Sequence, residues 1–304
     1  MDNVCHTLVG AACARAGLVR PVRYGLVTSM VAANLPDLDV LVFATGIPSV
    51  AFRRGWTHGV AAQLVLPILL AAALTVLGRR RPTDPGAASA DLRALLVLSY
   101  VGVLSHVFLD YLNNYGVRLL MPFSGRWFYG DAVFIVDPWL WVAFAAAFVA
   151  GRRGAVRHCR IWLLIAGLYI GGMLTSAGAA RRFVAAEWTR LHGAPPAALM
   201  VGPVPVNPFR KGVIVDAGDH YRTGSFTWLP PRLHLEESRV PKNDEHPAVG
   251  ATRAHPQVAA ILVWARFPFW NISPAAAGGW HVRVGDMRFA SMRRGGFSAS
   301  ALVR

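Results

Sequence analysis

Four long apolar stretches limit the folds that this chain can adopt. They cover about residues 59–77, 93–112, 133–150 and 161–180, and each approaches the roughly 20 residues that an α-helix needs to cross a bilayer. The composition agrees, because 54% of the residues are hydrophobic and only 15% are charged, against about 25% charged residues in ordinary soluble domains. Two shorter apolar stretches come first, at about 4–14 and 24–35. They are too short to cross, so we expect short helices that pack against the bundle or lie at the membrane interface.

The chain changes character from about residue 185. Prolines separate short β-branched runs such as "GVIVDAG" and "WHVRVG", a pattern typical of strands and turns. The segment 255–267 could form either a short helix or a strand. We therefore predict an α-helical polytopic membrane domain over residues 1–182, with about four spans plus two short N-terminal helices. A smaller β-rich extramembrane domain follows over residues 183–304.

Arginines are distributed unevenly among the loops of the first domain. The loops 78–92 and 151–160 carry more of them than the loops 46–58 and 113–132. Under the positive-inside rule, the two richer loops face the cytoplasm, although the arginines that follow the last span argue mildly the other way. This topology predicts that the C-terminal domain lies on the non-cytoplasmic side.

Charge and cysteine content exclude two other classes. The net charge is +15, but the basic residues sit mostly in short loops between apolar runs, as in loops that face lipid headgroups, so we expect no nucleic-acid partner. The three cysteines, Cys5, Cys13 and Cys159, form no C-x-x-C pair. A disulfide scaffold or a zinc ribbon is therefore not expected.

Five short segments carry side chains of the kinds that bind metals. They are "CHTLVG" with His6, "LPDLD" with Asp37 and Asp39, "RRGWTHG" with His58, "HVFLD" with His106 and Asp110, and "IVDP" with Asp137. On a helix, His106 and Asp110 lie on one face, one turn apart, and both are costly in an apolar setting unless paired, hydrogen-bonded or metal-bound. Imidazole and carboxylate are normal zinc ligands, and the predicted topology brings all five segments to one membrane face. The set suffices for a mono- or dinuclear hydrolytic centre.

Each segment also has a simpler explanation. The alternatives, in chain order, are a cap or surface role for His6, helix capping by Asp37 and Asp39, a membrane-interface role for His58, a structural hydrogen bond between His106 and Asp110, and an N-cap role for Asp137 before Pro138. None of them explains why the five segments gather at one face.

The motifs in this order resemble a known family. H-T-x-x-G, P-D-x-D, R-G-x-T-H, "HVFLDYLNNYG", "PFSGRWF" and "DP" resemble the bacterial membrane-bound metal-dependent hydrolases, also described as LexA-binding inner-membrane-associated hydrolases of the YdjM and YbcI type. The likeness covers about residues 1–145, and the C-terminal third resembles the extension of longer members more loosely. The family is similar to zinc-dependent phospholipase C. The resemblance implies a multi-pass protein of the bacterial inner membrane and metal-ligand roles for His6, Asp37 or Asp39, His58, His106 and Asp110.

Two positions depart from the family pattern. Members usually read H-R-G-x-T-H-S, whereas this chain reads Arg53-Arg54-Gly55-Trp56-Thr57-His58-Gly59. The first histidine is replaced by Arg53 and the final serine by Gly59. If that histidine is a ligand elsewhere, this chain has lost one, which argues against a complete dinuclear site.

We expect zinc-dependent hydrolysis of a phosphoester or a phospholipid by an activated water. One of Asp37, Asp39 and Asp137 would serve as the base, and Arg54 would contact an anionic oxygen of the substrate. The alternative is a non-catalytic membrane regulator or scaffold with a structural metal, whose β-rich domain binds a protein partner. A third and weaker reading is a transporter with a proton relay, which would line a path through the bilayer rather than gather its acids at one face.

Overall fold

The computed structural model describes residues 1–80, 89–276, 278–290 and 297–303. These residues form two compact units. The first comprises Met1–Asp39 and Arg54–Ser176, and the second comprises Val40–Arg53 and Ala177–Arg304. The predicted boundary after residue 182 falls inside the long helix that links the two units.

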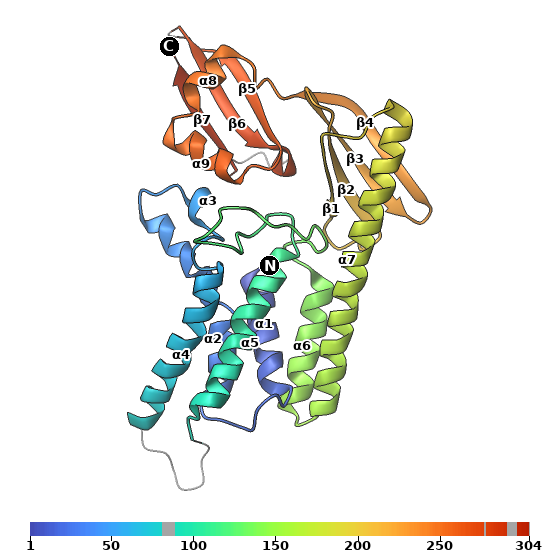
Figure 1. Cartoon of the computed structure of the whole chain (residues 1–304). Coiled ribbons are helices and arrows are strands. Elements are labelled where there is room, and N and C mark those ends of the chain that lie inside the picture. The colour runs from blue at the N-terminus through green and yellow to red at the C-terminus, as the bar shows by residue number, and fades with distance from the viewer. Residues whose placement is uncertain (81–88, 277, 291–296, 304) are drawn as a thin grey trace. The chain divides into compact units, whose positions relative to one another are not determined.

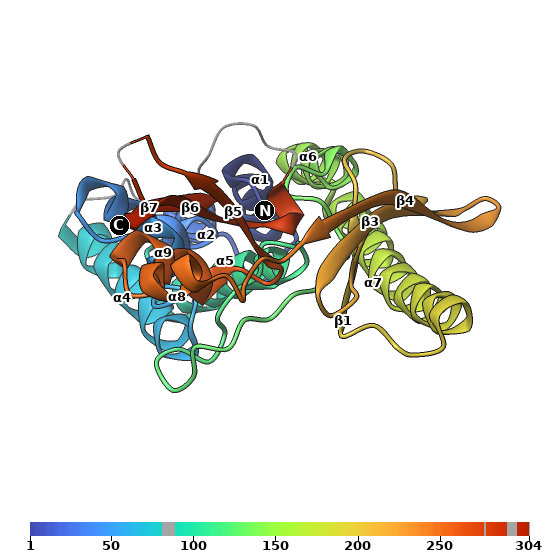
Figure 2. The same cartoon turned by 90° about the horizontal axis from the view of Figure 1, so that it is seen from above.

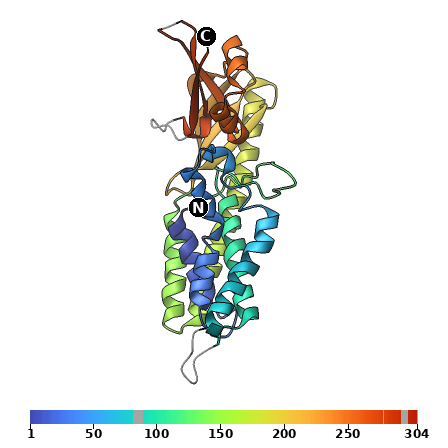
Figure 3. The same ribbon diagram turned by 90° about the vertical axis from the view of Figure 1, so that its left-hand side faces the viewer.

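The first unit is helical, and its helices run side by side (Figures 1 and 3). They are α1 (Asn3–Arg15), α2 (Gly25–Ala32), α4 (Val60–Arg80), α5 (Leu92–Tyr111), α6 (Pro138–Arg152) and the first part of α7 (Val156–His192), together with the start of the 3-10 helix η1 (Leu35–Ala44). The two short apolar stretches at the N-terminus form α1 and α2, as predicted.

Three aspartates begin helices of this unit as N-caps. Asp2 accepts hydrogen bonds from the amides of Val4 and Cys5, Asp91 accepts one from Ala94, and Asp137 accepts one from Leu140. Such caps satisfy amide groups that have no partner inside the helix. Capping therefore explains part of the aspartate content beside apolar segments.

Three helices of the described chain are long and apolar enough to cross a membrane, namely α4, α5 and α7. A fourth span arises if α2 and η1, which meet at a bend of 53°, count as one. The predicted span over 133–150 forms α6, which has only 15 residues and is shorter than a full crossing. The first unit therefore carries three to four candidate spans.

Small residues let three helices of the first unit approach closely. A Cβ atom added at Gly10 of α1 would lie 2.6 Å from the carbonyl oxygen of Ser29 in α2, and one added at Gly102 of α5 would lie 2.9 Å from the same oxygen. Close backbone contact through small residues is the usual way in which membrane helices pack. This packing holds α2 against both α1 and α5.

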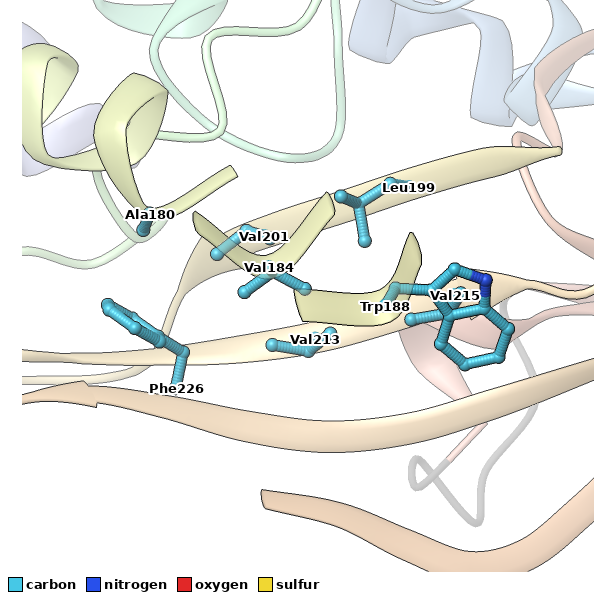
Figure 4. Packing of buried hydrophobic residues seen from close by; sticks show 8 residues of the cluster. All are labelled: Ala180, Val184, Trp188, Leu199, Val201, Val213, Val215 and Phe226. Carbon is cyan, nitrogen blue, oxygen red and sulfur yellow. The ribbon is translucent and has the colours of Figure 1, made fainter. Parts of the chain in front are cut away.

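The second unit contains a four-stranded antiparallel sheet. Its strands are β1 (Ala198–Pro203), β2 (Arg210–Asp216), β3 (His220–Trp228) and β4 (Pro231–Pro241), in that order. The last turns of α7 place Ala180, Val184 and Trp188 on one helix face, and these pack on Val213 and Val215 of β2 (Figure 4). Val213 and Val215 lie two residues apart on β2, so they point to the same face of the sheet and contribute to the core of this half of the unit.

A second antiparallel sheet, separate from the first in Figure 2, completes the unit. It consists of β5 (Pro268–Pro274), β6 (Trp280–Asp286) and β7 (Ser298–Val303), with the 3-10 helix η2 (Met287–Phe289) after β6. The helices α8 (Pro247–Thr252) and α9 (Pro256–Trp264) pack on it, and Val50 of α3 (Ser49–Phe52) joins the same core. The segment 255–267 thus forms a helix. A helical part with apolar spans followed by a β-rich part confirms the predicted fold class.

Candidate metal centre

Three segments of the first unit supply the polar side chains of one buried cluster. Asp37 comes from η1, His58 from the turn before α4, and His106 and Asp110 from the last two turns of α5. One ligand atom from each of the four residues lies within 4.8 Å of the others. His58, His106 and Asp110 are fully buried, whereas the side chain of Asp37 keeps 12% of its surface exposed.

The distances within this cluster match a metal-coordination shell. The Nε2 atoms of His58 and His106 are 3.2 Å apart, and Oδ2 of Asp110 lies 3.3 Å from the first and 3.6 Å from the second. Oδ1 of Asp37 lies 3.9 Å from Nε2 of His106. Zinc bonds of about 2.0–2.2 Å in a tetrahedron separate ligand atoms by about 3.3–3.6 Å. The four atoms could therefore hold one divalent ion with little movement.

Hydrogen bonds on the outer side of each imidazole decide which ring nitrogen faces inward. Nδ1 of His106 lies 2.7 Å from the carbonyl oxygen of Ala33, which can only accept a hydrogen bond. Nδ1 of His58 lies 3.5 Å from Oδ2 of Asp39 and 3.0 Å from Oγ1 of Thr57. His106 therefore carries its proton on Nδ1 and points the lone pair of Nε2 at the centre. His58 also turns its Nε2 inward, because its Nδ1 faces Asp39 and Thr57. The two Nε2 atoms lie 3.2 Å apart, close enough for one divalent ion to bind both.

Asp39 organises the turn that carries His58. Its Oδ2 accepts a hydrogen bond of 2.7 Å from the amide of Arg54 and one of 3.4 Å from the hydroxyl of Thr57. Arg54 has a φ of 53°, a left-handed conformation that is uncommon outside glycine and often occurs at functional sites. The Asp39 carboxylate thus holds together the R-G-W-T-H segment and orients the imidazole of His58.

The side chain of Arg54 binds the same carboxylate that faces the histidines. Its Nε lies 3.0 Å from Oδ2 of Asp110, and its Nη2 lies 3.0 Å from Oδ1. Nη1 donates to the side-chain oxygen of Asn113 at 3.0 Å, and the guanidinium lies 4.6 Å from the centre of the Tyr115 ring. A planar guanidinium in a two-point contact fixes the orientation of a carboxylate.

His6 lies beside the cluster, on the opposite oxygen of Asp110. Its ring stacks on that of His106 with centroids 3.8 Å apart, and its Nε2 lies 3.4 Å from Oδ1 of Asp110. The amino group of Met1 also contacts this oxygen. His6 is therefore within reach of the centre but outside the group of four.

Asp137 takes up a different position. It caps α6 through the amide of Leu140, and its Oδ2 accepts a hydrogen bond of 2.8 Å from the hydroxyl of Tyr169. Among the described residues, it does not belong to the group that could hold an ion. Its geometry is that of the helix cap that the sequence before Pro138 also allowed.

Three partners of the cluster had no role in the sequence interpretation. They are the carbonyl oxygen of Ala33, which orients His106, and the side chains of Asn113 and Tyr115, which hold Arg54. Asn113 lies inside the "HVFLDYLNNYG" motif, so its place in the polar end of this motif was the available signal. No sequence signal identifies a backbone carbonyl.

The two departures from the family pattern have distinct surroundings. Arg53 belongs to the second unit, where its guanidinium lies 5.6 Å from the centre of the Phe43 ring. At Gly59, an added Cβ atom would lie 2.4 Å from the backbone oxygen of Met121. Glycine at this position therefore lets the loop after α5 approach the start of α4.

Comparison with known proteins places the helical unit in a family. The model of the YdjM inner membrane protein family matches residues 1–180. The chain belongs to this family. The match covers all four residues of the cluster and the segments that carry His6, Asp39 and Arg54.

The YdjM-family chain also resembles a protein of Bacillus subtilis strain 168 that is described as the uncharacterized protein YfhP. The two are 24% identical over 182 residues, which cover 56% of this chain and 53% of YfhP. The matched part thus spans about half the length of this curated relative. No solved structure matches the YdjM-family chain.

Proposed function

We propose that this YdjM-family protein is a membrane-bound metal-dependent hydrolase that cleaves a phosphoester. The observation that carries the proposal is the pair of inward-facing Nε2 atoms of His58 and His106, 3.2 Å apart, which lie within 4.8 Å of carboxylate oxygens of Asp37 and Asp110. Zinc is the ion we propose, because two imidazoles and carboxylates are among its usual ligands. When bound, such an ion supplies Lewis acidity and lowers the pKa of water at the site.

The residues of the chain divide the remaining work. His58, His106 and Asp110 would hold the ion, with His6 as a further candidate ligand. Asp37 is more exposed than Asp110, the other carboxylate of the cluster. We therefore assign it either the last ligand position or the role of base that accepts a proton from water. The base role predicted for Asp39 and Asp137 is harder to fill, because other groups already engage both carboxylates.

Arg54 has a positioning role in this proposal. Its two-point contact with Asp110 would keep the carboxylate turned toward the histidines while the ion is bound. The contact between Arg54 and a substrate anion, which the sequence predicts, stays a prediction.

The first test is metal analysis of the full chain purified in detergent. We expect about one zinc per chain in the wild type and in His158→Ala, a control that removes an exposed histidine of α7. His106→Ala should lose most of the zinc, and Asp110→Asn should lose less because the amide keeps the shape of the carboxylate. Background zinc in the wild type after metal-replete growth would overturn the metal assignment.

The second test is hydrolysis of bis(p-nitrophenyl) phosphate by the zinc-loaded protein. Turnover should disappear with a chelator, return with zinc, and be lost in His106→Ala. A metal-loaded wild type that does not hydrolyse this or a simple phosphomonoester would contradict the hydrolase proposal while leaving the metal site intact.

A specific observation supports one rival function, a structural metal in a non-catalytic scaffold. Three members of the cluster are fully buried, and with Asp37 they make four ligands, the number that closes a structural zinc site. Electron–nuclear double resonance of the cobalt-substituted protein in oxygen-17 water distinguishes the two, because a closed site has four protein ligands and no oxygen from water. In that case the C-terminal unit would carry the function by binding a protein partner.

A further inference from the structure

We propose a binding site for an anionic phospholipid at the end of the helical unit opposite the metal centre. The metal cluster lies where α5 ends and α4 begins, whereas two adjoining cavities lie where α1 and α6 end and α5 begins. Their volumes are about 490 Å³ and 510 Å³. All residues that line them belong to the first unit.

The two cavities share one wall, the segment Val19–Val22 between α1 and α2. Arg15 and Arg20 line the first cavity, and Arg20 and Arg93 line the second. All three arginines are exposed, and none has an ion pair or hydrogen bond within the described part of the chain. Asp91 also lines the second cavity, where its carboxylate caps α5. The two cavities are therefore lined by three guanidinium groups and one carboxylate, which leaves an excess of positive charge.

The same cavities have apolar walls. Val22 lines both, Leu98 and Tyr24 line the first, and Val97 lines the second. A phospholipid headgroup with the start of its acyl chains presents the complementary surface, an anionic phosphate above hydrocarbon. Basic pockets between membrane helices are a recurring way to bind anionic lipid headgroups.

Hydrogen bonds hold the shared wall in place before any ligand binds. The guanidinium of Arg160 donates to the carbonyl oxygens of Ala16 and Gly17, at 2.7 Å and 3.2 Å. The amide of Arg23 donates to the carbonyl oxygen of Ser89 at 3.2 Å. A fixed wall lowers the entropy cost of binding. The position also suits a lipid, because α4 ends in Arg79 and Arg80 and α5 starts at Leu92, which marks the boundary of the hydrocarbon layer.

Native mass spectrometry of the full chain in detergent tests the site, with phosphatidylglycerol and phosphatidylcholine as probes. The wild type should retain phosphatidylglycerol at least about tenfold more strongly. The double variant Arg20→Gln/Arg93→Gln should bind phosphatidylglycerol about 25-fold more weakly, since each basic residue near a membrane contributes about fivefold in affinity for anionic lipid. Val97→Trp, which fills part of the second cavity without changing the charge, should also weaken phosphatidylglycerol binding severalfold.

A matched control removes the same charge from the same end. Arg153 and Arg157 are exposed and line neither cavity, so Arg153→Gln/Arg157→Gln should change retention less than about threefold. Equal loss in both double variants would show a diffuse charge effect and overturn the site. Equal retention of the two lipids by the wild type, or full competition by millimolar inorganic phosphate, would overturn the lipid assignment. Circular dichroism of each variant confirms that it is folded.

Discussion

Asp37 and Asp39 are two residues apart, yet they contact different groups. Asp37 faces Nε2 of His106, while Asp39 binds the amide of Arg54 and lies near Nδ1 of His58. In a 3-10 helix with three residues per turn, positions i and i+2 point about 240° apart around the axis. The carboxylate of Asp37 therefore reaches the centre, and that of Asp39 holds the turn that carries His58.

Asp39→Asn should weaken metal binding without abolishing it. The amide keeps the size of the side chain but loses the negative charge that favours a proton on Nδ1 of His58. Loss of such a support usually lowers metal affinity about 10- to 100-fold, whereas His58→Ala removes a ligand and should lower it further. Competition titration with a zinc-binding dye measures both affinities. Equal zinc affinity of Asp39→Asn and the wild type would show that Asp39 does not support the metal centre.

Gly59→Ser, which restores the residue usual in the family, should destabilise this chain. The new Cβ atom would lie 2.4 Å from the backbone oxygen of Met121, so the loop must move, at a cost of about 1–3 kcal/mol. Gly125→Ser is the matched control, because nothing lies within 4 Å of a Cβ atom there. Thermal unfolding in detergent compares the two. Equal midpoints would mean that the loop yields freely.

Lys211 of β2 gives a prediction about pH. Its register partner on β3 is Phe226, its side chain is fully buried, and its Nζ has no hydrogen-bond partner among the described residues. Burial lowers the pKa of Lys211 to about 8, whereas an unfolded lysine titrates near 10.4. Between pH 8 and 10 the unfolded state keeps the proton of Lys211 and the folded state has lost it, so the contribution of this side chain to stability should rise with pH.

Lys211→Met should remove that rise and stabilise the protein at pH 7 by about 1–3 kcal/mol, because an unpaired polar group leaves the core. Denaturant unfolding at several pH values measures both effects. The control is Lys242→Met, at the only other lysine, which is 2.8 Å from Asp216. That variant keeps the buried lysine, so the rise should persist in it. A pH dependence of stability in Lys211→Met equal to that of the wild type would refute the assignment.

At the scale of the helices, the metal centre depends on close packing between α2 and α5. The approach of Ser29 to Gly102 also brings the carbonyl oxygen of Ala33, one residue past α2, to Nδ1 of His106. The helix that carries the ligands and the helix that orients them are therefore positioned by the same contact.

Gly102→Ala should lower both stability and metal content. A Cβ atom there would lie 2.6 Å from that of Ala32 and 2.9 Å from the amide nitrogen of Ala33, so α2 and α5 must separate. We expect a loss of about 1–3 kcal/mol and less zinc per chain. Gly171→Ala on α7 meets nothing within 4 Å and should be neutral or slightly stabilising, since alanine favours helix. Unchanged zinc content in Gly102→Ala would show that metal binding does not depend on the close contact between α2 and α5.

At the scale of the whole molecule, the open question is which side of the membrane holds the second unit. The arginine distribution predicts the non-cytoplasmic side. A cysteine introduced at Glu245, an exposed position between β4 and α8, should then react with an impermeant maleimide in intact spheroplasts. The parent protein, whose three cysteines are buried or half-buried, is the control. Reaction only after lysis would reverse the topology.

The sequence alone determined the helical part and the β-rich part, because hydrophobic periodicity and turn residues are local properties. It did not determine every span, since the apolar run 133–150 forms only the 15-residue helix α6. It also supplied a set of candidate metal ligands, and Asp37, His58, His106 and Asp110 of that set form the group that could hold an ion. Only the tertiary structure separated Asp37 from Asp39, turned Asp137 into a cap with Tyr169, and set Arg54 on Asp110. These outcomes depend on contacts between segments far apart in the chain. A local pattern specifies which groups are available, and packing decides which of them meet.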